Sequence, residues 1–269
     1  MNIKHKSTLK KLRDYLSFER YSERTIETYC CYAEMFLSNF NKDVYHISVK
    51  EAEKFLIEFN YSSISQQNQI ISAVKHLYLK VVGSKLNTFN IKRPRKQKKL
   101  PRVIDAEQLA SKIKSITNLK HRAILQLGLS CGLRVSEVIN LKWEHLDRKR
   151  NILNVIGGKG NKDRACILND NMIHLLEKYY RDFKPMEYVF NGQNSLQYST
   201  SSIQKLVKKY IDENESYHLL RNSYATFAID EGTELKPLSV SMGHNSTRTV
   251  ERFYFHQSKR TLKTIRQAI

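Results

Sequence analysis

Five short stretches of the sequence carry side chains that could bind and activate a phosphate group. Arginine and histidine donate hydrogen bonds to phosphate oxygens, lysine and histidine can transfer a proton, and a tyrosine hydroxyl can act as a nucleophile. The candidate residues are Arg134 with Glu137, Lys159, His218 with Arg221, His244 and Tyr254.

Two of these stretches place an arginine beside a second ionisable residue. In "GLRVSE", Arg134 stands where a helix is expected to begin, and Glu137 one turn later can hold its guanidinium group. In "HLLR", His218 and Arg221 share one face of a helix because they are three residues apart. Each pattern has an ordinary alternative, which is a surface ion pair in the first case and a neutral histidine beside a solvated arginine in the second.

The other three candidates stand alone in their stretches. Lys159 in "GGKGNKDR" is either a mobile cation at a hairpin tip that can reach a phosphate or an ordinary turn lysine. His244 follows Gly243. It is either a hydrogen-bond donor to a phosphate or a hydrogen-bonded histidine at a helix end. Tyr254 is either a nucleophile or one more aromatic side chain of the core or surface. Taken singly, the structural role is the commoner one for each residue type.

The first part of the chain is expected to form a bundle of about four helices, which we assign to residues 1–88. Ser22 is a predicted N-cap, and Ser48 with Glu51 has the spacing of a capping box. A further helix, from about Ser65 to Val82, is expected to stop at Gly83, a residue that can adopt the left-handed conformation at a helix end.

A basic segment, residues 89–101, separates this bundle from the rest of the chain. Its two prolines, Pro94 and Pro101, prevent an uninterrupted helix. Such a run is either a solvated linker or a strand of chain that follows a phosphate backbone. The cations we single out as candidate DNA contacts are Lys92, Arg93, Arg95, Lys96, Lys98 and Lys99.

Residues 102–269 are expected to form a second domain that is mainly helical. Helices are predicted from Asp105, over 119–130, around "LRVSEVINL", and over 172–183, 201–211, 219–229 and the C-terminus. Between them, "NILNVIGGKGNKDRACIL" alternates like two strands around a glycine-rich turn, which predicts a β-hairpin. The fold class is therefore mainly α with a small β-sheet or hairpin, in two domains.

The charge balance favours a polyanionic partner. Lys and Arg total 46 against 26 Asp and Glu, a formal excess of +20, and nucleic acid is the commonest partner of such an excess. A membrane surface is the weaker explanation, because the cations do not lie opposite an apolar helix face. The chain has neither a long apolar run nor a signal-peptide pattern, so we expect a cytoplasmic protein. Its four cysteines have neither a disulfide framework nor zinc-ligand spacing.

Read in order, the motifs "GLRVSE", "GGKGNKDR", "HLLRNSYATFAIDEG" and "GHNSTRTVERFYFH" resemble the signature of the tyrosine recombinases, the phage integrase or Xer-like family of site-specific recombinases. The resemblance extends over essentially the whole chain. It implies an N-terminal core-binding, SAM-like DNA-binding domain, the basic linker and a catalytic domain with a C-terminal tail helix. The two domains would close around DNA as a clamp.

The resemblance also implies a mechanism for cleaving and rejoining DNA strands through a 3′-phosphotyrosyl intermediate. Arg134 and Arg221 would bind the non-bridging oxygens with His244 as a further donor, and Glu137 would support Arg134. Lys159 would protonate the leaving 5′ oxygen, His218 would assist proton transfer, and Tyr254 would be the nucleophile. Fixed cations would replace metal ions, and no cofactor or metal is expected.

The position of the tyrosine departs from the family pattern. In the common form it lies nine residues after the histidine of the Gly-His pair, and nine residues after His244 is Phe253. Counting back from His256, as in the family's Tyr-x-His, gives Tyr254 instead. Either a one-residue insertion leaves Tyr254 as the nucleophile, which we favour, or Phe253 occupies the nucleophile's place and the chain cannot cleave DNA.

The partners implied are double-stranded DNA with paired inverted-repeat core sites and three further copies of the chain. The copies would form a homo-tetramer on two DNA duplexes through the C-terminal tail, residues 259–269, where Leu262, Ile265 and Ile269 have helical spacing. The main expectation is thus a recombinase that integrates, excises or resolves DNA. The alternatives are a DNA-binding form of the same fold that cannot cleave, and a nicking and resealing enzyme like the type IB topoisomerases.

Overall fold

The computed structural model describes residues 3–83, 91–95, 102–157, 163–243 and 246–253. The chain divides into two compact units, Met1–Lys98 and Lys99–Ile269. Helices dominate both units, as predicted, and the described strands all belong to the second one. No helix among the described residues is long and apolar enough to cross a membrane.

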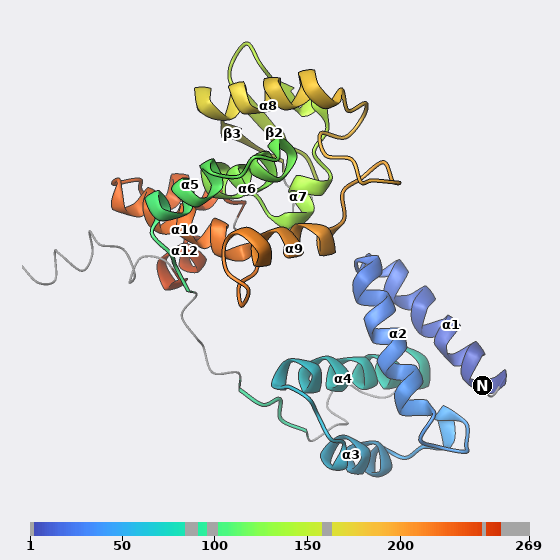
Figure 1. Cartoon of the computed structure of the whole chain (residues 1–269). Helices are drawn as coiled ribbons and strands as arrows, with labels where there is room; N and C mark the ends of the chain where they lie inside the picture. Colours follow the sequence, from blue (N-terminus) through green and yellow to red (C-terminus); the bar gives the residue numbers. More distant parts are fainter. Residues whose placement is uncertain (1–2, 84–90, 96–101, 158–162, 244–245, 254–269) are drawn as a thin grey trace, which may run out of the picture. The chain divides into compact units, whose positions relative to one another are not determined.

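The N-terminal unit is built from helices that pack around one apolar core (Figure 1). Its elements are α1 (Ile3–Phe18), α2 (Glu23–Leu37), the 3-10 helix η1 (Val44–His46), α3 (Val49–Glu58), α4 (Ile64–Leu77) and the π-helical turn η2 (Tyr78–Val82). Phe36 lies at the centre of this core, with its ring 5.1 Å from that of Phe40 and 5.2 Å from that of Phe55. The buried hydroxyl of Tyr78 donates a hydrogen bond of 2.9 Å to the carbonyl of Ile47.

The predicted helix ends in this unit are confirmed. The hydroxyl of Ser22 accepts a hydrogen bond from the backbone N–H of Thr25, and Ser48 and Glu51 form the reciprocal bonds of a capping box. Gly83 ends η2 with φ of +80°. The helix predicted from Ser65 begins one residue earlier, at Ile64, because Ser63 supplies the N-cap.

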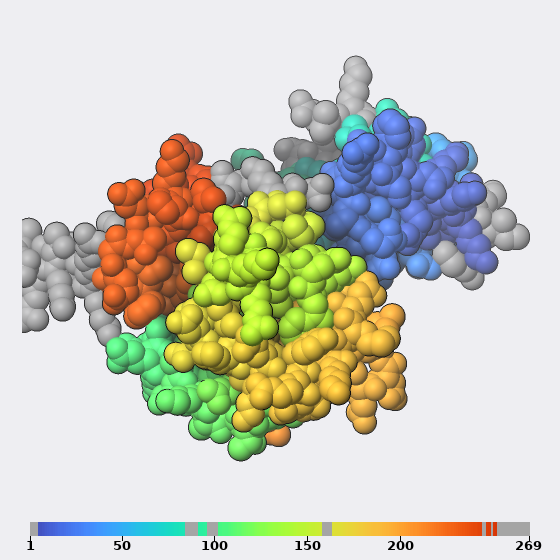
Figure 2. Space-filling view, turned by 90° about the horizontal axis from the view of Figure 1, so that it is seen from above, coloured from blue at the N-terminus to red at the C-terminus, as the bar shows by residue number. Residues whose placement is uncertain are grey.

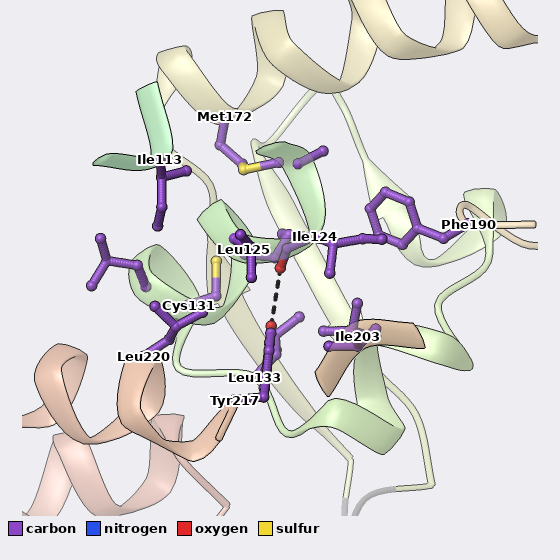
Figure 3. Packing of buried hydrophobic residues seen from close by; sticks show 14 of the residues in the cluster. Ile113, Ile124, Leu125, Cys131, Leu133, Met172, Phe190, Ile203, Tyr217 and Leu220 are labelled. Carbon is purple, nitrogen blue, oxygen red and sulfur yellow. Dashed lines mark hydrogen bonds between the residues drawn. The ribbon is translucent and has the colours of Figure 1, made fainter. Parts of the chain in front are cut away.

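The second unit, which we call the C-terminal unit, surrounds the buried helix α6 (Leu119–Cys131). Figure 1 shows α6 between α8 (Asp170–Phe183) and α10 (His218–Asp230), and it packs against both. Figure 3 shows side chains of α6 inside the core, where the hydroxyl of Tyr217 donates a hydrogen bond of 3.1 Å to the carbonyl of Ile124. This bond satisfies the polar end of an otherwise apolar side chain. The other helices are α5 (Ala106–Lys114), α7 (Val135–Ile139), the 3-10 helix η3 (Trp143–His145), α9 (Thr200–Tyr210), α11 (Leu235–Ser241) and α12 (Thr247–Phe253).

The predicted hairpin is confirmed as β2 (Ile152–Val155) paired antiparallel with β3 (Arg164–Ile167). The structure adds a third strand, β1 (Leu146–Asp147), which pairs with β2. A two-residue strand is too short for an alternating pattern to appear in the sequence, so only the pairing reveals it.

The last described helices form a separate lobe of the C-terminal unit. Ala225 and Ile229 of α10 pack with Leu238 of α11, with Met242 directly after α11, and with Val250 of α12. The space-filling view shows this lobe in orange-red beside segments from the middle of the chain (Figure 2). The sequence patterns did not distinguish α11 and α12 as elements, because helices of seven residues show little periodicity.

Candidate active site

Arg134 and Glu137 form the pair that their spacing predicts. Arg134 is the N-cap of α7, and its backbone N–H donates to Glu137 Oε2 at 2.6 Å. Its Nη1 donates to Glu137 Oε1 at 2.8 Å. The side chains are only 16% and 4% exposed, so the alternative of a solvated surface ion pair is wrong.

A second arginine, Arg164 at the start of β3, holds the same carboxylate. Its Nη1 and Nη2 each donate to a different oxygen of Glu137 at 2.7 Å, in the bidentate geometry that suits a guanidinium and a carboxylate. Its Nε donates to the carbonyl of Ser241 at 2.6 Å. Glu137 therefore lies between two guanidinium groups from different elements.

The two arginines determine the charge of Glu137. Burial by itself would raise the pKa of this carboxyl group, but hydrogen bonds from Arg164 and from the backbone and side chain of Arg134 hold the pKa at about 2. Glu137 is therefore ionised throughout the pH range in which proteins work, and it acts as a fixed anion between the two cations.

Arg221 and His218 lie one turn apart on α10 and face different surroundings. Arg221 is 2% exposed, so the alternative of a solvated arginine is wrong. It donates to the carbonyl of Gly132, which ends α6, and through Nη2 to the carbonyl of Met242 at 2.5 Å. The His218 residue remains exposed on one side. The burial of its other side and then the charges of Arg221 and Arg134 lower its pKa, so that the neutral imidazole predominates at neutral pH.

The three arginines converge on successive carbonyl groups at the end of α11. Arg164 binds the carbonyl of Ser241, Arg221 that of Met242, and Arg134, through Nη2 at 2.9 Å, that of Gly243. The last carbonyls of a helix lack partners within the helix, and cations bind them favourably. These bonds hold the chain segment that leads directly to His244.

Gly243 is required by this arrangement. Its φ is +63°, a region that strains other residues, and an added Cβ would lie 3.3 Å from Nη1 of both Arg134 and Arg164. A side chain here would crowd the two guanidinium groups that hold Glu137.

The other predicted site residues are located only in part. Lys159, His244 and Tyr254 lie outside the described residues, as do Lys96, Lys98 and Lys99 of the linker. β2 and β3 flank the segment that contains Lys159, and Phe253 is the last residue of α12. Lys92, Arg93 and Arg95 are exposed. Among the residues that the structure describes, no group of three possible metal ligands occurs.

Sequence reasoning missed Arg164. The burial of β3 alternates, with Arg164 and Cys166 inward and Ala165 and Ile167 outward. The inward position of an arginine at the start of this strand was the available signal, because a charge on the buried face of a strand requires a buried partner. The partner, Glu137, is far away in the sequence and could not be identified from the pattern.

Comparisons with known proteins agree with the fold and extend over nearly the whole chain. The phage integrase family matches residues 101–261, and the N-terminal SAM-like domain of phage integrases matches residues 8–88. Tyrosine recombinase XerA from Pyrococcus horikoshii is 31% identical, over 99% of this chain and 94% of that protein. The crystal structure of XerA recombinase has a TM-score of 0.55 at 26% identity and covers 98% of both chains. XerH site-specific recombinase bound to its difH substrate has a TM-score of 0.70 at 22% identity, covering 89% of this chain and 78% of that one.

Proposed function

The chain belongs to the phage integrase family of tyrosine recombinases, enzymes of site-specific DNA cleavage and rejoining, and we propose that its arginine cluster binds the scissile phosphate. One observation carries the proposal. Arg134 and Arg221, which lie far apart in the sequence, both bind carbonyls of the turn that leads to His244. A phosphate beside this turn would meet cations from two elements in a partly dry environment, where their attraction to an anion is strong.

In the proposed reaction, the phenol oxygen of Tyr254 attacks the phosphorus atom of a DNA phosphodiester. The bond to the 5′ oxygen breaks, so the products are a 3′-phosphotyrosyl link and a free 5′-hydroxyl group. Reversal by a 5′-hydroxyl from another strand joins DNA without ATP, because the protein–DNA bond retains the energy of the original phosphodiester.

The neighbouring side chains are assigned to charge stabilisation and proton transfer. Arg134 and Arg221 donate to the non-bridging oxygens as negative charge grows on them, and His244 is a further donor. Neutral His218 assists in removing the proton of the Tyr254 hydroxyl group, a role that its lowered pKa supports. Lys159 gives its proton to the leaving 5′ oxygen. These fixed donors perform the charge stabilisation that metal ions perform in other phosphoryl transfer enzymes.

We assign residues 1–88 to a core-binding domain, 89–101 to a linker along the DNA backbone and 102–269 to the catalytic domain. The exposed Lys92, Arg93 and Arg95 support the linker's role, since cations that neutralise phosphates release counterions and strengthen binding. The cytoplasm is the proposed location. Paired inverted-repeat core sites in double-stranded DNA are the proposed target.

Covalent trapping tests the proposed function. A target duplex is first selected from a random-sequence pool by binding to the full chain. A nick placed near the cleavage point then lets the short fragment that carries the new 5′-hydroxyl diffuse away, so that the strand cannot be rejoined. We expect a protein–DNA adduct that resists denaturation, forms in EDTA without ATP, and maps by mass spectrometry to the peptide that contains Tyr254. Absence of an adduct on every selected duplex, despite tight binding, would identify a DNA-binding protein that does not cleave.

We further propose that four copies assemble on two duplexes through the C-terminal tail, residues 259–269. Leu262, Ile265 and Ile269 have helical spacing in the sequence, and on a helix they would form an apolar face that a neighbouring copy could bury. A variant that ends at residue 258 is expected to bind a single site with unchanged affinity but to lose recombination between two sites. Mobility-shift titration and a two-plasmid recombination assay measure the two properties. Normal recombination by the shortened chain would refute this role of the tail.

A further inference from the structure

Arg164 connects the elements that carry the proposed site residues. It begins β3, whose connection to β2 contains Lys159, and opposite it in the sheet lies Val155 of β2. Its guanidinium group binds Glu137 of α7 and the carbonyl of Ser241 at the end of α11. One side chain therefore joins the hairpin, the helix whose N-cap is Arg134 and the turn that leads to His244.

The pairing of Arg164 with a buried carboxylate argues against direct contact with DNA. Both of its Nη atoms donate to Glu137 and its Nε to the carbonyl of Ser241, whereas Arg221 donates to the neutral carbonyls of Gly132 and Met242. A phosphate could bind the two Nη atoms only by removing their bidentate bonds from Glu137, a carboxylate that is itself buried. Arg164 thus acts on the reaction through other groups.

The charge of Glu137 requires a second cation. A buried carboxylate is costly unless it is paired and its lone pairs are hydrogen-bonded. Arg134 contributes one side-chain bond to Glu137 and one to the carbonyl of Gly243. Without Arg164, the carboxylate would keep only its bonds to Arg134 and would draw that guanidinium group further toward itself. The Arg134 nitrogens that are proposed to bind phosphate would then change direction.

We propose that Arg164 is a positioning residue for DNA strand cleavage, which orients Arg134 through Glu137 and holds the turn before His244 through the carbonyl of Ser241. The inference rests on the proposed function, since it takes Arg134 to be a phosphate ligand. It assigns Arg164 an effect on the rate of the chemical step and almost none on DNA affinity. A displacement of about 1 Å in a catalytic group is sufficient to slow a reaction on the order of 10²-fold.

The test measures single-turnover cleavage of the nicked duplex by the full chain at saturating protein, together with DNA affinity and melting temperature. Arg164→Gln is expected to cleave on the order of 10² times more slowly while it binds DNA within about threefold of the parent. Arg164→Lys, which keeps the charge but not the forked geometry, is expected to have an intermediate rate. Arg148→Gln is the matched control, because Arg148 is 77% exposed and pairs with Glu177 on the surface.

A double-mutant cycle separates positioning from general loss of structure. If Arg164 acts through Glu137, the Arg164→Gln/Glu137→Gln double variant loses far less activity than the product of the two single losses. Multiplicative losses, or a folded Arg164→Gln that cleaves at the parental rate, would overturn the inference. If Arg164→Gln melts before the assay temperature, Arg164→Lys decides in its place: a parental rate overturns the inference and a reduced rate at unchanged affinity supports it.

Arg134→Ala is measured beside these variants to separate the two proposals. If Arg134→Ala cleaves as fast as the parent, the proposed phosphate site is wrong and the failure belongs to the function. If Arg134→Ala is inactive and Arg164→Gln is not slowed, only the positioning role of Arg164 fails.

Discussion

A Tyr254→Phe variant is expected to form no covalent complex with the nicked duplex while it binds that duplex as tightly as the parent. Phenylalanine retains the ring but has no hydroxyl group, so no nucleophile attacks the phosphorus atom. The adduct band of the parent should disappear entirely, which makes this the largest expected effect of any single substitution. Denaturing electrophoresis of labelled DNA measures the adduct, and mobility shift measures binding.

Phe253 provides the decisive comparison, because it is the last described residue of α12 and the family spacing counts to it. Successive residues of a helix differ by about 100° in direction, so only one of two neighbours could aim at the phosphate if the helix continued. Phe253→Tyr in the Tyr254→Phe background is expected to remain inactive. An adduct in Phe253→Tyr but none in the parent would show that position 253, and not position 254, faces the phosphate. Tyr180→Phe, at a tyrosine 49% exposed on α8, is the matched control and should cleave normally.

The second large effect is expected from Arg221→Lys. Arg221 binds the carbonyls of Gly132 and Met242 from inside the protein, and a lysine ammonium is a point charge that cannot reproduce this fork. Loss of one preorganised donor to a transition-state oxyanion costs on the order of 10²–10³-fold in rate. We therefore expect single-turnover cleavage to fall by about that factor at nearly unchanged DNA affinity, since the proposed linker cations would also contribute to DNA binding.

The melting temperature and a surface variant control this result. Arg221→Lys retains the positive charge in a buried position, so some loss of stability is expected, and the cleavage assay is run well below the melting temperature of the variant. Arg148→Lys changes an exposed arginine of the same unit and should cleave like the parent. A folded Arg221→Lys with the parental cleavage rate would exclude Arg221 as a ligand of the scissile phosphate.

Local patterns in the sequence predicted most of the helices and the hairpin. Ser22, Ser48 and Gly83 mark helix ends because capping and left-handed turns depend on residues only a few positions apart. The pair of Arg134 and Glu137 follows for the same reason, since residues three apart in the sequence meet within one turn. The order of the motifs was sufficient to identify the family that the comparisons show.

What the tertiary structure decided is how these groups are paired. Arg164 reaches Glu137 and Ser241 across separations that no local periodicity reports, and the burial of Arg221 depends on the packing of α10 against α6. Alternatives that the sequence left open, such as a solvated or a buried Arg221, were settled by which elements cover the side chain. Hydrogen bonding within a turn is encoded by neighbours in the chain, whereas the pairing of buried charges depends on distant elements that meet only when the apolar core forms.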